Sequence, residues 1–112
     1  MKRRKQPSKS AQAEKVVDRE MNIGCFRGPG KIREAVWQDR AGIVVRYNLA
    51  LIHHVLCQKD NGRVLGYDSA HGRHYRHFMG KLEDFEFVSY EALTGKFFNG
   101  EAELCKKSRK ED

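Results

Sequence analysis

The sequence lacks any long hydrophobic run. A membrane-spanning helix needs about 20 apolar residues, whereas the longest apolar stretch here, residues 49–57, is interrupted by His53 and His54. The basic N-terminus is not followed by an apolar segment, so we expect no secretory signal. We therefore predict a cytoplasmic protein that makes no contact with a membrane.

Cysteine is scarce as well. Cys25, Cys57 and Cys105 lie far apart and form no C-x-x-C pair. An odd and scattered set argues against a disulfide framework and fits a reducing compartment.

Acidic residues are few where basic residues gather. Over the whole chain of 112 residues the net charge is +7, and six basic residues fall within residues 1–15 against the single acid Glu14. A second basic region covers residues 58–81, whereas residues 82–91 are acidic. This distribution favours a polyanionic partner, RNA or DNA, although a basic tail that serves only solubility would give the same pattern.

Alternation of apolar and polar residues predicts a small sheet. The expected strands are residues 31–37, 43–57, 63–68, 73–79 and 82–88. The strand at 43–57 carries the strongest signal, and its length suggests a bend near His53. Ser89 is a good N-cap for an amphipathic helix that we expect to end near Gly100. The fold class is therefore α+β: an antiparallel β-meander of four to five strands with a C-terminal helix packed on one face.

One domain accounts for the chain. We expect residues 1–30 to form a basic, flexible N-terminal tail. Within it, residues 14–21 are able to form two helical turns. Residues 31–105 form the α+β domain, and residues 106–112 form a charged C-terminal tail. The single tryptophan, Trp37, is assigned to the core by default.

Residues 62–80 hold three of the five histidines among four glycines, which favours a β-hairpin. We place Asp68 opposite Arg73 and Gly66 opposite Tyr75. On a strand, His74 points away from His71 and His77, so we expect no zinc site and no cofactor. One face then carries Asp68, Arg73, Tyr75 and His77, and the other carries Leu65, Tyr67, His74, Arg76 and Phe78.

These side chains suit phosphodiester chemistry, because imidazole transfers protons near neutral pH and guanidinium stabilises charge on phosphorus oxygens. The candidate catalytic residues are His77, His74, Arg76, Asp68 and Tyr75. The candidate nucleic-acid-binding residues are Arg46, Arg63, Arg73, His71 and Lys81. Structural roles remain open as alternatives. The histidines are also typical of polar strand positions, Asp68 of a turn, and Tyr75 of a ring that covers Gly66. Tyr75 has a further functional alternative, which is to stack on a base.

About half of the chain, roughly residues 42–98, resembles the TumE-like toxins of prokaryotic toxin–antitoxin pairs. The matching residues are Arg46, Tyr47, Val64, Leu65, Gly66, Tyr67, Asp68, Ala70, His71, Gly72, His74, Arg76, His77, Gly80, Phe87 and Ser89. Ser69 and Tyr75 depart from the family pattern, which usually has Asn and His there. The resemblance implies growth inhibition that a small helix-turn-helix antitoxin neutralises.

Three hypotheses follow for the function. The first is a metal-independent ribonuclease toxin in which one histidine deprotonates a 2′-hydroxyl and arginines stabilise the charge on phosphorus. The second is a non-catalytic nucleic-acid-binding module, whose binding weakens steeply with salt. The third is a toxin that inhibits a host protein through its sheet edge. A homodimer remains open under all three.

Overall fold

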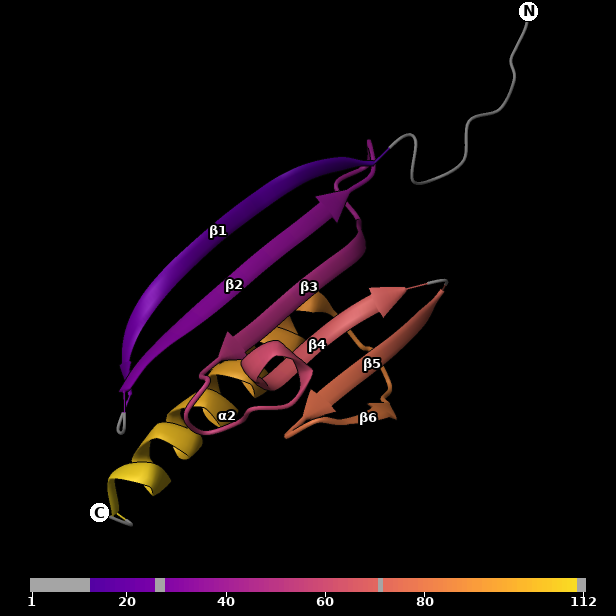
Figure 1. Ribbon diagram of the computed structural model, residues 1–112. Coiled ribbons are helices and arrows are strands. Elements are labelled where there is room, and N and C mark those ends of the chain that lie inside the picture. The colour runs from indigo at the N-terminus through magenta and orange to yellow at the C-terminus, as the bar shows by residue number, and fades with distance from the viewer. Residues whose placement is uncertain (1–12, 26–27, 71, 111–112) are drawn as a thin grey trace, which may run out of the picture.

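The computed structural model describes residues 13–25, 28–70 and 72–110. Six strands form one antiparallel sheet in the order β1-β2-β3-β4-β5-β6, and one helix lies against one of its faces (Figure 1). The strands are β1 (Glu14–Cys25), β2 (Gly28–Gln38), β3 (Val44–Ile52), β4 (Arg63–Ala70), β5 (Arg73–Phe78) and β6 (Lys81–Asp84), and the helix is α2 (Tyr90–Lys110). The predicted α+β meander is confirmed, although it has six strands where we expected four to five. No helix among these residues is both long and apolar enough to cross a membrane.

The additional strand, β1, lies in the segment that we assigned to the tail. The helical turns predicted for residues 14–21 are wrong, because this segment pairs with β2 along its whole length. Val17, Met21 and Ile23 are half-buried at alternating positions, while exposed charged residues between them hide the period of two. The sheet therefore begins well before residue 31.

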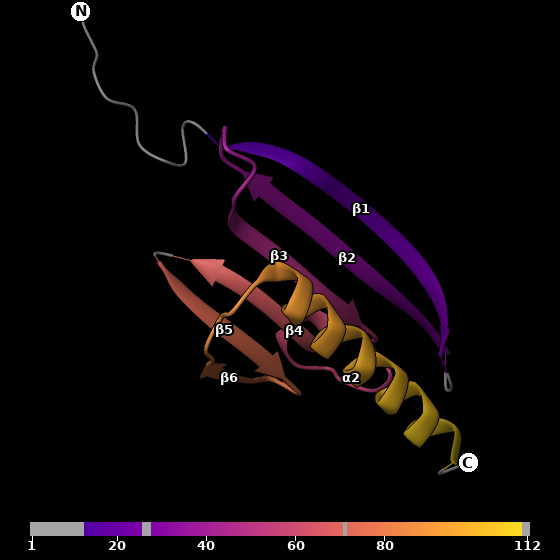
Figure 2. The same cartoon turned by 180° about the vertical axis from the view of Figure 1, so that it is seen from behind.

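The core lies between the sheet and α2. Figure 2 shows α2 lying across this face of the sheet. From β3, Tyr47, Leu49 and Leu51 point into the core with at most 2% of each residue exposed. From α2, Leu93 and Phe97 meet them and are at most 3% exposed. Full burial of such side chains stabilises the fold by about 1.5–3 kcal/mol each.

Ser89 caps α2 as predicted, because its Oγ accepts a hydrogen bond from the backbone N–H of Ala92 at 3.0 Å. The expected end near Gly100 is wrong, since the helix continues to Lys110 and includes most of the predicted C-terminal tail. Gly100 marks a close approach instead. A Cβ atom there would lie 2.8 Å from Cδ2 of Leu65 in β4, so the missing side chain lets the helix pack against the sheet.

The β4–β5 hairpin has the predicted faces in a different register. Asp68 stands opposite Tyr75, and Gly66 opposite His77, so the pairing of Asp68 with Arg73 is wrong by two residues. An even shift leaves every side chain on the face expected for it.

Two further expectations are wrong. Trp37 is only half-buried and lies on the face that α2 does not cover. Cys105 is disulfide-bonded, which the scattered cysteines did not predict, whereas Cys57 is free and buried.

Candidate functional site on the open face

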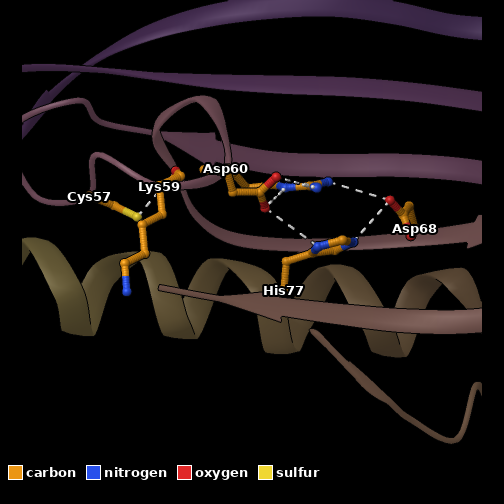
Figure 3. A network of polar contacts seen from close by, with 6 residues as sticks. Cys57, Lys59, Asp60, Asp68 and His77 are labelled. Atoms are coloured by element: carbon orange, nitrogen blue, oxygen red, sulfur yellow. Dashed lines mark hydrogen bonds and ion pairs between the residues drawn. The ribbon is translucent and has the colours of Figure 1, made fainter. Parts of the chain in front are cut away.

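The sheet has one face covered by α2 and one open face. The open face carries a polar cluster where the short 3-10 turn η1 (Asp60–Gly62) meets β4 and β5. We call the cluster of Asp60, Arg63, Asp68 and His77 the open-face cluster. Figure 3 shows the His77 ring between the two carboxylates.

His77 contacts a carboxylate through each ring nitrogen. Its Nε2 lies 3.2 Å from Oδ2 of Asp68, and its Nδ1 lies 3.5 Å from Oδ2 of Asp60. The His77 side chain is only 12% exposed, so the cluster holds the ring in one orientation. The shorter contact identifies Asp68 as the hydrogen-bond partner of the imidazole.

Arg63 joins the two carboxylates. It donates from Nε to Oδ2 of Asp60 at 2.8 Å, from a terminal nitrogen to Oδ1 at 3.1 Å, and from the other to Asp68 at 3.4 Å. The hydrogen bond from Arg63 is the main reason why the pKa of the Asp60 carboxyl is lowered. Two carboxylates and one guanidinium leave one net negative charge around the His77 ring.

The backbone explains why these residues meet. Asp60 and Asn61 have φ values of 53° and 55°, and Gly62 has 83°, so three left-handed residues turn the chain sharply toward the open face. The β3–β4 ladder shifts register between Leu51 and Ile52. This β-bulge places Arg63 over Gly66, where a Cβ atom would lie 2.7 Å from Cδ of Arg63.

His74 lies on the opposite face, away from His77. Its ring stacks on Phe87 at a centroid distance of 4.5 Å, and its Nδ1 lies 2.8 Å from the hydroxyl of Tyr47. Burial lowers the pKa of His74. Burial, followed by the charge of Asp68, raises the pKa of the Tyr47 hydroxyl, so that hydroxyl stays protonated and donates to the neutral imidazole.

The remaining candidates in β5 and β6 do not join the cluster. Arg73 and Arg76 form exposed ion pairs with Asp84 at 2.9 Å and Glu83 at 3.1 Å. Arg76 shares the helix-covered face with His74, whereas Tyr75 shares the open face with His77. Lys81 is exposed at the start of β6, and His71 lies outside the described residues.

A hollow of about 420 Å³ extends over the open face from the cluster toward the N-terminal strands. Asp60 and Arg63 line one end, and Lys15 and Trp37 line the other. Residues of β2 and β3 line the hollow between the two ends, and they are Arg33, Glu34, Ala35, Asn48, Ala50 and Ile52. The guanidinium of Arg46 lies 4.5 Å above the Trp37 ring centroid.

The sequence-based candidates His77, Asp68, Arg63 and Arg46 lie on the open face, and the structure adds Asp60 and Trp37, which were not among the candidates. The signal that could have found Asp60 is the Asp-Asn-Gly sequence of residues 60–62, one of the few that tolerates consecutive left-handed residues. Within the ranges that the structure describes, no group of three or more histidine, cysteine or acidic side chains is arranged to hold a metal ion. Comparisons of the chain with protein-family models, curated proteins and solved structures gave no match.

Proposed function

We propose that this chain is the toxin of a toxin–antitoxin pair and cleaves RNA without a metal ion at the open-face cluster. The observation that carries the proposal is the single imidazole of His77, oriented by Asp68 and adjacent to the Arg63–Asp60 pair. An imidazole fixed by a carboxylate is the usual arrangement of a general base. The family resemblance adds a small helix-turn-helix antitoxin as the protein partner.

His77 is the base in this proposal. Asp68 accepts the hydrogen bond of Nε2–H, so Nδ1 carries the lone pair. At 3.5 Å, the separation of Nδ1 from Asp60 exceeds a good hydrogen bond, and a ribose 2′-hydroxyl that displaces the Asp60 carboxylate reaches Nδ1. His77 then takes the proton as the 2′-oxygen bonds to phosphorus.

The leaving group needs a proton. As the bond between phosphorus and the 5′-oxygen breaks, Tyr75, on the same face and opposite Asp68, donates its hydroxyl proton to that oxygen. Arg63, freed from Asp60 by the same displacement, stabilises the charge on the phosphorus oxygens. The products are a 2′,3′-cyclic phosphate and a 5′-hydroxyl end. His74 and Arg76 have no role in this reaction, because they lie on the helix-covered face.

The test is incubation of the purified chain with single-stranded RNA in the presence of EDTA, followed by analysis of the new ends. His77→Asn is expected to lower the cleavage rate by about 10²- to 10⁴-fold, the usual contribution of general acid–base catalysis. Arg76→Gln is the matched control, since it alters a polar residue of the same strand on the other face. Unchanged cleavage by His77→Asn would refute the assignment.

A second candidate function is RNA binding without cleavage. It is favoured by the fact that both nitrogens of His77 already face carboxylates, so a base is formed only if Asp60 moves. This function gives binding that falls steeply with salt and no new RNA ends at any protein concentration.

A further inference from the structure

We propose that Trp37 is a stacking platform for an unpaired base, which makes single-stranded RNA the ligand of the hollow. The choice of RNA rests on the proposed function, whereas the stacking site is argued from the open face alone. The site consists of Trp37 in β2, Arg46 in β3 and Lys15 in β1.

Two cations lie over the indole ring, so a base that stacks on the ring takes the place of one of them. The Arg46 guanidinium is 4.5 Å and the Lys15 ammonium 5.0 Å from the ring centroid. Lys15 pairs with Asp18 at 3.2 Å, whereas Arg46 has no carboxylate within ion-pair distance among the described residues. Grooves that bind single strands combine such cations, which attract phosphates, with aromatic rings on which bases stack.

A core role does not explain this tryptophan. Trp37 is half-buried on the face away from α2. The hollow beside it is lined by the small residues Ala35 and Ala50 together with charged residues such as Asp18 and Arg33. A volume of about 420 Å³ is in the usual range for small-molecule sites and accommodates a nucleoside. Asn48 supplies an amide on the floor that is able to donate and accept hydrogen bonds with a base edge.

The two ends of the hollow suit a strand rather than a mononucleotide. Trp37 pairs with Arg46, and two residues further along β3 Asn48 pairs with Asp68. Two strand spacings and two residues of rise separate Trp37 from Asp68 by about 12 Å, which is several times the rise of one stacked nucleotide. An RNA that crosses β2, β3 and β4 therefore places one base on the indole while its backbone reaches Arg63.

Fluorescence gives a direct test because the chain contains one tryptophan. The probe is an oligouridine of about six nucleotides, within the site sizes of known single-strand binders, titrated into His77→Asn so that cleavage does not interfere. We expect quenching of Trp37 emission by single-stranded RNA and by single-stranded DNA, since every base offers a π-face, and none by duplex RNA.

Two variants define the contribution of the platform. Trp37→Leu, measured with labelled RNA, is expected to weaken binding by about 5- to 150-fold, the range that corresponds to loss of one stacked base, and Trp37→Phe to restore most of it. Arg46→Ala is expected to weaken binding and reduce its salt dependence. Arg76→Ala is the matched control, because Arg76 also lies over an aromatic ring, at 5.0 Å from the Phe78 centroid, but on the other face.

The outcomes separate this inference from the proposed function. RNA cleavage that depends on His77 without quenching of Trp37 would overturn the stacking platform and leave the function intact. Quenching by single strands without cleavage would support the platform and overturn the ribonuclease. Equal affinity of Trp37→Leu and wild type, or equal quenching by duplex RNA, would also overturn the platform.

Discussion

Gly66→Ala is expected to disrupt the open-face cluster although it changes none of the charged residues. The new Cβ atom would lie 2.7 Å from Cδ of Arg63. Carbon atoms in contact lie about 3.5–4.0 Å apart, so the Arg63 side chain must retreat by about 1 Å. That movement opens the hydrogen bonds from Arg63 to Asp60 at 2.8 Å and to Asp68 at 3.4 Å.

The magnitude follows from those hydrogen bonds. A hydrogen bond to a charged group contributes about 1.5–3 kcal/mol, and water replaces part of it because the Arg63 side chain is 19% exposed. We therefore expect Gly66→Ala to lower the free energy of unfolding by about 1–2 kcal/mol. In an Arg63→Ala background the same change is expected to be neutral or to stabilise by up to about 1 kcal/mol, since alanine loses less entropy than glycine in a strand.

Urea denaturation of the four proteins of this double-mutant cycle measures the effect. The account predicts a coupling energy of at least about 1 kcal/mol between the two positions, with unchanged m-values. An equal penalty in both backgrounds would contradict it. The cost would then arise from the Leu49 carbonyl oxygen, which lies 3.4 Å from the position of the new Cβ atom.

Three further predictions concern the turns, the buried imidazole and the helix cap. Met79 and Gly80 have φ values of 50° and 86° in the two-residue loop between β5 and β6. Met79→Asn is therefore expected to raise the free energy of unfolding by about 0.5–1 kcal/mol, measured as a higher urea midpoint. A lower midpoint would argue against a type I′ turn. Burial lowers the pKa of His74, so the unfolded chain binds a proton more readily than the folded one. Stability therefore falls as the pH drops below about 6.5. His74→Phe is expected to reduce this loss of stability in thermal melts. An unchanged dependence of the melting temperature on pH would show that another group causes the loss. Ser89→Ala removes the hydrogen bond to Ala92 and is expected to cost about 1 kcal/mol in the same denaturation assay, with no loss if the cap is dispensable.

The hairpin shows how far sequence reasoning extends to the site. Alternation along residues 63–79 assigned the faces of His74 and His77 correctly, because side chains alternate along a strand whatever its register. The register itself was displaced by two residues, since Arg73 pairs with Ala70 rather than with Asp68. A shift of one residue would have exchanged the faces and reversed every inference about the site.

Two features of the site depend on contacts that alternation does not report. A β-bulge moves Arg63 onto the open face, whereas strict alternation from Gly66 would place it with the core residues. Trp37 was assigned to the core because tryptophan is usually buried. Its real position depends on which face α2 covers, and that choice is decided by packing between segments far apart in the sequence.

The most direct test of the central claim is induced expression in a bacterial host, with growth and the ends of total RNA followed for wild type, His77→Asn and Arg76→Gln. The account predicts growth arrest and new RNA ends for wild type and for Arg76→Gln, and neither for His77→Asn when that variant is shown to be folded. Growth arrest with intact RNA, or arrest that persists in His77→Asn, would contradict a ribonuclease that acts through the open-face cluster.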